Sequence, residues 1–213
     1  MRVEKAIKKE GYIVRAKGIH SNKNILCIDI DNVIALTDKV MRSIIFRYTS
    51  GRVNLNYEDI IDFDYCKAID PKGNSITKNE WIDIHCLFSL PQNLSRIKPY
   101  SNIQTHLSIL STRYNIHLVT SRLKSGWFAT LQWLERHHVP YDGIHFVKHL
   151  EKHIVLGNAD AIIEDDFQQA LYFAESGINA YIIEHPWNIG RPGRENMFWV
   201  TGWENLIKKL MGS

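Results

Sequence analysis

The stretch Ile25-Leu-Cys-Ile-Asp29-Ile-Asp31-Asn-Val33 decides the fold of this 213-residue chain. Its apolar run is too short for helical periodicity and is typical of a strand buried on both faces of a parallel sheet. Two carboxylates, Asp29 and Asp31, stand where this strand ends. In open α/β sheets, ligands bind at the carboxyl ends of the strands. Two acids there need a cation or a proton to share the site, unless they only cap the following helix.

Three further apolar runs end in polar residues in the same manner. They are 115–119 before Thr120, Ser121 and Arg122, 144–147 before Lys148 and Lys152, and 161–163 before Glu164, Asp165 and Asp166. A fifth run covers residues 180–183. Helical segments alternate with these runs at 102–111, 127–137, 167–176 and 204–210. This alternation predicts an α/β fold with a doubly wound parallel sheet.

Composition and charge set broad limits. The chain is 45% hydrophobic and 23% charged, as in ordinary globular proteins, and can hold one domain or a core with a small insertion. A net charge of +3 suits anionic substrates but is too small to imply nucleic-acid binding. No apolar window reaches the roughly 18 residues of a membrane span, and the charged N-terminus lacks a signal-peptide core. Three cysteines without paired spacing, Cys27, Cys66 and Cys86, favour a reducing cytoplasm.

Two segments fall outside the strand–helix alternation. Residues 37–98 contain no buried parallel strand, and we expect helices at 39–46, at 57–63, and from the capping box of Thr77 and Glu80 through Phe88. This segment is therefore a helical insertion between the first and second core strands. Residues 1–24 suggest a short amphipathic helix, with Val3, Ala6 and Ile7 on its apolar face, and then an extended piece at 11–15.

Ten histidines are present, and three of them recur every fourth residue: His145, His149 and His153. On one helix they would form a zinc-binding face. His145 belongs to the predicted strand 144–147, however, so the spacing does not translate into one face. We expect structural or surface roles for them.

The order of the polar strand ends is an Asp pair, then Thr-Ser, then Lys, then an acidic pair. This order resembles the haloacid dehalogenase (HAD) superfamily of phosphotransferases, whose four motifs lie on successive strand ends. The resemblance implies a HAD-like Rossmannoid core, residues 1–36 and 99–213, with a small helical cap, 37–98, inserted after the first motif. Many family members carry Gly where this chain has Asn32, and Asn tolerates the left-handed backbone that such a turn requires.

The same resemblance implies a phosphatase mechanism. Asp29 would be the nucleophile that forms an aspartyl-phosphate, and Asp31 would protonate the leaving oxygen and then activate water. Thr120 would donate its hydroxyl to the phosphoryl group, with Ser121 as the competing register. Lys152 would neutralise the phosphoryl charge, with Lys148 as its rival.

Oxygen ligands suit Mg²⁺ better than zinc. The resemblance assigns the metal to Asp29, the backbone carbonyl of Asp31, and the pair Glu164 and Asp165, with Asp165 as the direct ligand. Asp166, the third acid, is expected to cap the helix 167–176.

Four late segments, 139–146, 162–165, 185–188 and 200–203, resemble the 5′(3′)-deoxyribonucleotidase-type branch. The substrate implied is a small phosphorylated molecule, a nucleoside monophosphate. Trp81 and Phe88 could stack on its base or form the core of the cap, and Arg122 could bind phosphate or lie on the surface. Another small phosphate, a nucleic-acid phosphate end, or a non-catalytic binding protein with this fold remain the alternatives. We expect a cytoplasmic protein with no membrane partner, and a homodimer is compatible with the sequence.

Overall fold

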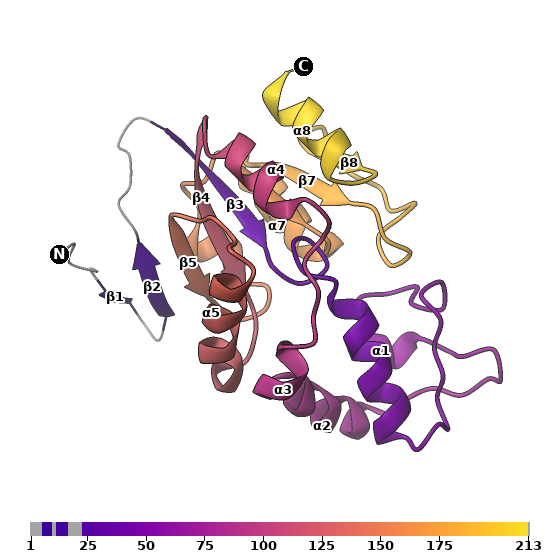
Figure 1. The fold of residues 1–213 in the computed structure, drawn as a ribbon. Coiled ribbons are helices and arrows are strands. Elements are labelled where there is room, and N and C mark those ends of the chain that lie inside the picture. Colours follow the sequence, from indigo (N-terminus) through magenta and orange to yellow (C-terminus); the bar gives the residue numbers. More distant parts are fainter. Residues whose placement is uncertain (1–5, 10–11, 17–22, 213) are drawn as a thin grey trace.

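The computed structural model describes residues 6–9, 12–16 and 23–212. These residues form one sheet in the order β1-β2-β5-β4-β3-β6-β7-β8 (Figure 1). Its strands are β1 Ala6–Lys9, β2 Tyr12–Ala16, β3 Asn24–Asp29, β4 Tyr114–Thr120, β5 Gly143–Phe146, β6 Ala161–Glu164, β7 Asn179–Ile183 and β8 Met197–Val200. All pairings from β5 across to β8 are parallel, which confirms the predicted sheet, although β8 was not predicted.

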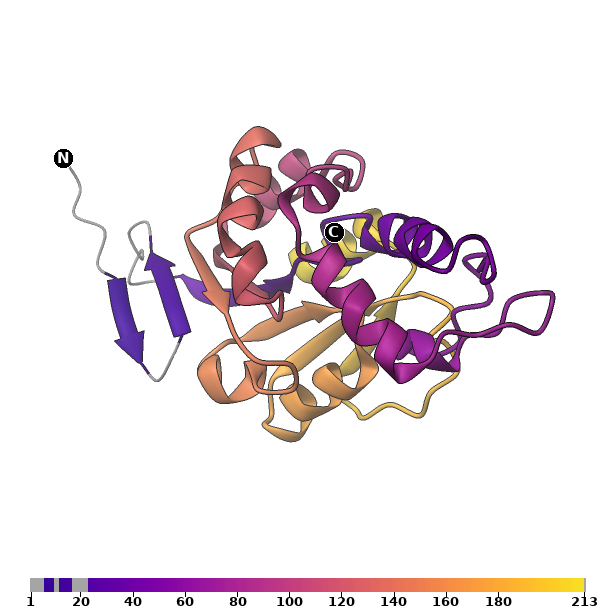
Figure 2. The same cartoon turned by 90° about the horizontal axis from the view of Figure 1, so that it is seen from below.

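Helices cover both faces of the sheet (Figure 2). They are α1 Thr37–Tyr48, α2 Lys78–Phe88, α3 Pro91–Leu94, α4 Ile103–Leu110, α5 Trp127–Arg136, α6 Lys152–Val155, α7 Phe167–Glu175 and α8 Trp203–Met211. Side chains alternate along a strand, so Leu26 and Ile28 of β3 join the apolar cluster of α4, α5 and α8, whereas Cys27 joins that of α7. None of the described helices combines the length and apolarity that crossing a membrane requires.

The sheet order brings the predicted motifs to one edge. Strand β3 lies between β4 and β6, and β5 lies beyond β4. In the parallel register Asp29 is level with Val119, and Thr120 is level with Phe146. The carboxyl ends of β3, β4 and β6 therefore open toward the same space, where α1 and α2 also lie (Figure 1).

The segment between β3 and β4 leaves and rejoins the sheet domain at one point. The Leu36 amide donates to the Lys98 carbonyl at 2.8 Å, and the Tyr100 amide donates to the Ile34 carbonyl at 2.9 Å. This double connection supports the proposed cap boundaries at 37 and 98. Apolar side chains of α1 and α2 are continuous with the cluster that covers β3, so cap and core share one buried interior.

Within this segment, two helix predictions hold and one is wrong. Helix α1 contains the predicted 39–46, and α2 begins with the predicted capping box, in which Thr77 and Glu80 bond reciprocally. Residues 57–63, however, form turns. The carboxylate of Asp59 accepts from the Asn56 amide at 2.6 Å, and that of Asp62 from the Asp64 amide at 3.0 Å. Such local bonds compete with a helical ladder.

The N-terminal helix prediction is also wrong where it can be compared. Ala6 and Ile7 lie in β1, and β2 covers most of the predicted extended piece; Val3 and Gly11 lie outside the described residues. Strand β2 pairs antiparallel with β5, and β1 with β2. The open edge of β5 offers main-chain groups that another strand can satisfy, so tertiary pairing overrides the weak helical pattern.

Candidate active site

A buried lysine stands at the centre of the site. Lys152, the first residue of α6, donates to Asp29 Oδ1 at 2.7 Å and also bonds to Glu164. All three side chains are buried. The side chain of the rival Lys148 is 79% exposed and pairs with Glu151 at 3.9 Å. The structure therefore brings Lys152, and not Lys148, to the predicted nucleophile.

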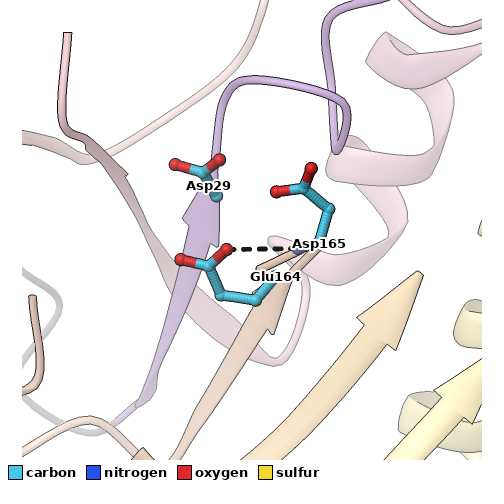
Figure 3. Close-up of side chains that lie close together, drawn as sticks. All are labelled: Asp29, Glu164 and Asp165. Carbon is cyan, nitrogen blue, oxygen red and sulfur yellow. Dashed lines mark hydrogen bonds between the residues drawn. The ribbon is translucent and has the colours of Figure 1, made fainter. Parts of the chain in front are cut away.

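Three carboxylates converge at the ends of β3 and β6. Oxygens of Asp29, Glu164 and Asp165 lie within 4.8 Å of one another (Figure 3). Burial raises the pKa of Asp29 to about 7, although the Lys152 ammonium acts in the opposite direction. Burial, followed by the charges of Asp29 and Glu164, raises the pKa of Asp165 well above its usual range. The cluster holds more negative charge than one lysine neutralises.

A hard divalent cation fits this arrangement. Carboxylate oxygens are ligands that Mg²⁺ prefers, and excess buried negative charge is what such a cation would neutralise. The oxygens of Glu164 are engaged by Lys152 and by the amides of Asp165 and Asp166. The carboxylate of Asp165 has one side-chain bond, from Asn32 Nδ2 at 3.2 Å. Asp29 and Asp165 are therefore the better placed ligands, with Glu164 behind them.

Asp31 is not a member of this cluster. Its carboxylate accepts a two-pronged ion pair from Arg122, with Nη2 at 2.7 Å and Nε at 3.0 Å, and a bond from the Thr37 hydroxyl at 2.6 Å. Burial alone would raise the pKa of Asp31, but the Arg122 guanidinium and its hydrogen bonds hold that pKa below its usual range. The side chain of Asp31 is therefore fixed in place by Arg122 and Thr37, and its backbone carbonyl is the group left for a metal.

The two hydroxyls after β4 differ in placement. Thr120 is fully buried, and its hydroxyl accepts from the Arg122 amide at 3.3 Å. Ser121 lines the cavity described below, and its buried hydroxyl has no hydrogen-bond partner among the residues that the structure describes. Of the two residues, only Ser121 is part of the cavity lining, which favours Ser121, the competing register, over Thr120 as the phosphate-binding residue.

A segment late in the chain, residues 185–203, holds the Asp29–Val33 loop in place. The role of this segment could not be deduced from the residues at the strand ends alone. Burial lowers the pKa of His185 to about 4, so its ring carries one proton. His185 Nε2 donates to the Asn32 carbonyl at 2.9 Å, and Nδ1 accepts from the Tyr57 hydroxyl at 2.6 Å. Asn188 Nδ2 donates to the Asp165 carbonyl at 2.9 Å, and Trp203 Nε1 donates to Val33 at 2.8 Å. The only signal in the sequence was the resemblance of 185–188 and 200–203.

Asn32 takes the left-handed conformation expected of it, with φ of 57°. Its side chain forms two hydrogen bonds that a glycine could not form. The amide nitrogen donates to Asp165, and the oxygen accepts from the Asp38 amide in α1 at 2.8 Å. The departure from Gly therefore links the acidic cluster to the first helix of the cap.

The site opens into a cavity of about 390 Å³ between cap and core. One wall is a ladder of stacked rings from Tyr65 to Trp81 to His85, with centroids 5.3 and 5.4 Å apart. A stacked pair, Phe63 and His149, also lines it, with centroids at 5.4 Å. The predicted Trp81 and Phe88 both line the cavity, and Arg122 and Asp166 lie on its polar side.

Asp166 and the three histidines that recur every fourth residue make contacts within the protein that are typical of structural residues. The carboxylate of Asp166 caps α7 by accepting from the Gln168 amide at 2.9 Å. His145 pairs with His117 at 2.9 Å, His149 stacks on Phe63, and His153 packs against Tyr172. These histidines do not converge on one point, and the acidic cluster is the one metal-compatible group among the described residues.

Comparison with known sequences places the chain in a family. The family model for "5′ nucleotidase, deoxy (Pyrimidine), cytosolic type C protein" matches residues 23–208. No curated protein sequence matches the chain. The matched segment contains every candidate site residue discussed above, the residues 37–98 of the cap, and residues 185–203, which hold the Asp29–Val33 loop.

Solved structures show the same fold. A haloacid dehalogenase-like hydrolase from Streptococcus pneumoniae is 15% identical, with a TM-score of 0.61 over 88% of this chain and 98% of its own. A HAD family hydrolase from Deinococcus radiodurans, with bound phosphate and sodium, is 10% identical, with a TM-score of 0.59 over 90% and 96%. CbbY from Rhodobacter sphaeroides, in complex with phosphate, is 11% identical, with a TM-score of 0.57 over 86% and 96%.

Proposed function

This chain belongs to the family of cytosolic type C 5′ nucleotidases, HAD-type phosphatases, and we propose that it is a magnesium-dependent phosphatase of nucleoside monophosphates. The observation that supports this most is the placement of Asp29 beside Lys152 and Asp165, at the floor of a cavity with aromatic walls. Phosphoryl transfer needs a nucleophile, countercharge and a proton for the leaving group. Asp29 would be the nucleophile, Lys152 would supply countercharge, and Asp31 would supply the proton.

The proposed reaction has two steps. In the first, Asp29 attacks phosphorus, and the bond to the leaving oxygen breaks as Asp31 donates a proton to that oxygen. In the second, Asp31 takes a proton from water, the water oxygen attacks phosphorus, and the bond to Asp29 breaks to release phosphate. Lys152 holds the carboxylate of Asp29 in place, and Ser121, which lines the cavity, would donate its hydroxyl to a phosphoryl oxygen.

HAD family members typically use a divalent metal, and Asp29, Asp165 and the Asp31 carbonyl would hold Mg²⁺ here. The ion would remove repulsion between the carboxylates and the phosphoryl group. Lys152 and the amides that bond Glu164 keep the remaining acid oriented. Asn32 and Asn188 fix Asp165 from both its side chain and its backbone.

Metal removal gives a direct test. We expect EDTA to abolish turnover and Mg²⁺ to restore it. Because ligand binding to the folded state stabilises it, Mg²⁺ should also raise the thermal midpoint of the wild type. Asp165→Asn removes a charged ligand while keeping the shape, so this variant should lose the shift. Full turnover in EDTA would refute the metal assignment, whatever the thermal data show.

The cavity supports a nucleotide substrate. A phosphate at Asp29 would place the rest of the molecule under the cap, where Trp81 and Phe63 line the cavity. Trp81 is stacked between Tyr65 and His85, so a base would meet the edge of its ring. Stacking on a base is worth about 1–3 kcal/mol. Phe88 is buried and packs near His85 and Arg122, so Trp81 is the better candidate for base contact.

Replacement of Trp81 tests this assignment. We expect Trp81→Ala to lower kcat/KM for deoxynucleoside monophosphates by about 10- to 100-fold and to leave that for glucose 6-phosphate nearly unchanged. Phe128→Ala is the matched control, because Phe128 is 70% exposed and lies outside the cavity lining. Equal losses for both esters would show that Trp81 only supports the cap. Equal wild-type kcat/KM for the two esters would rule out the nucleotide preference.

The cellular setting is part of the same proposal. The family is described as cytosolic, and all three cysteines of this chain are free. We therefore propose that the enzyme works in the cytoplasm.

A further inference from the structure

Arg122 follows the β4 strand end, where sequence reasoning left open whether it binds phosphate. Its guanidinium donates to protein groups on two sides. The Nε and Nη2 edge pairs with Asp31, and Nη1 donates to the Thr130 hydroxyl of α5 at 3.1 Å. The side chain is 2% exposed, against 25% for the Asp31 side chain. Of this pair, the carboxylate is the member that meets the cavity more openly.

The partners of this pair are themselves fixed. The Thr130 hydroxyl donates to the Gly126 carbonyl at 2.9 Å, so it can only accept from Arg122. The guanidinium carbon lies 5.9 Å from the centre of the Phe88 ring, which belongs to α2 of the cap. Asp31 also receives the Thr37 hydroxyl from the first turn of α1. The acid is therefore oriented by α5 on one side and by the cap on the other.

We propose that Arg122 is a positioning residue that sets the orientation of Asp31 and that it is not a phosphate ligand. A planar guanidinium fixes a carboxylate through two parallel bonds, which fix its rotation as well as its place. A general acid must meet the leaving-group oxygen at hydrogen-bond distance, and a misdirected carboxyl loses this contact. The inference rests on the proposed phosphatase function, because it assigns Arg122 to the proton-transfer half of that reaction.

The two roles for Arg122 predict different dependence on the leaving group. A nucleoside alkoxide needs a proton as it departs, whereas 4-nitrophenolate leaves without one. The ratio kcat/KM reports only the steps up to phosphoryl transfer to Asp29, so it isolates the acid function of Asp31 from its later function as a base. A phosphate ligand, by contrast, would serve both esters equally and would also strengthen the binding of inorganic phosphate.

The experiment measures kcat/KM for a deoxynucleoside monophosphate and for 4-nitrophenyl phosphate, and the inhibition constant of inorganic phosphate, in wild type and variants. For Arg122→Lys and Arg122→Gln we expect a loss of about 10²-fold with the nucleotide, less than about 10-fold with the aryl ester, and phosphate inhibition within about 3-fold of wild type. Arg122→Lys should not restore the two parallel bonds to Asp31, although the single positive charge of a lysine would be enough to bind a phosphate.

A milder variant covers the case in which Arg122 variants do not fold. Thr130→Val keeps the shape and removes only the anchor of Nη1, so it should show the same leaving-group pattern at smaller size. Equal losses on both esters with phosphate inhibition weakened about 10-fold or more, rescued by Arg122→Lys, would overturn the proposal. Unchanged kinetics in all three variants would overturn it as well. A wild type that cleaves neither ester would instead refute the phosphatase function itself.

Discussion

Asp29→Asn is expected to abolish turnover. An amide cannot form the bond to phosphorus, and loss of a covalent nucleophile lowers rates by at least about 10⁴-fold. The variant should nevertheless fold, because Asn has the shape of Asp and removes one of three crowded charges. Lys152 keeps its second partner, Glu164. Steady-state rates on an aryl phosphate and on a nucleotide, together with a thermal melt, check both halves of this expectation.

The control for this variant is Asp160→Asn. Asp160 also lies near β3, where its carboxylate accepts from the Ile25 amide at 2.7 Å, but at the opposite end of the strand. Asp160→Asn should keep the wild-type rate of turnover. Wild-type turnover by Asp29→Asn on the aryl ester would show that the nucleophile is another group.

Lys152→Met should be the most destabilising change at the site. It leaves Asp29, Glu164 and Asp165 buried without a protein countercharge, and breaking a buried ion pair in this way costs about 3–5 kcal/mol. Urea denaturation in EDTA measures the free energy of unfolding without help from a metal. Lys148→Met is the matched control: the same replacement at an exposed lysine should change that free energy by less than about 0.5 kcal/mol.

The pH dependence of this loss has a fixed sign. The folded-state pKa of Asp29 is raised from 3.8 to about 7 even with Lys152 present. A group whose folded pKa is raised binds protons more tightly when folded, so its contribution to stability falls as pH rises across that interval. Without Lys152 the loss should therefore be larger at pH 8 than at pH 5. Equal destabilisation by the two lysine variants would contradict the central place given to Lys152.

Much of the fold could be predicted because local pattern and tertiary structure agree there. The apolar runs before Asp29, Thr120 and Glu164 are short and lack helical periodicity, which favours buried strands, and they form β3, β4 and β6. Where local pattern is weak, the prediction failed. Residues 57–63 were predicted as a helix, but hydrogen bonds from backbone amides to side chains stabilise turns there. Residues 6–9 were also predicted as helical, but they form a strand that extends the edge of the sheet.

In the candidate site, too, some features could be predicted from the sequence and others could not. The candidate residues at strand ends were predicted from their position, and Lys152 was favoured over Lys148 through the family resemblance; the structure brings Lys152 to Asp29. Contacts between segments that are distant in the sequence were not predicted. The bond from His185 to Asn32 and the ion pair between Arg122 and Asp31 span 153 and 91 positions in the chain. No periodicity or spacing signals contacts of this kind.

The most direct test of the account is to trap the covalent intermediate. Wild-type enzyme turning over a deoxynucleoside monophosphate with Mg²⁺ is quenched in acid, reduced with borohydride and digested, and its peptides are sequenced by mass spectrometry. The account predicts reduction of an acyl-phosphate to homoserine at position 29 alone, dependent on substrate and lost in Asp29→Asn. Efficient turnover with reduction at another acid, such as Asp31 or Asp165, would contradict it.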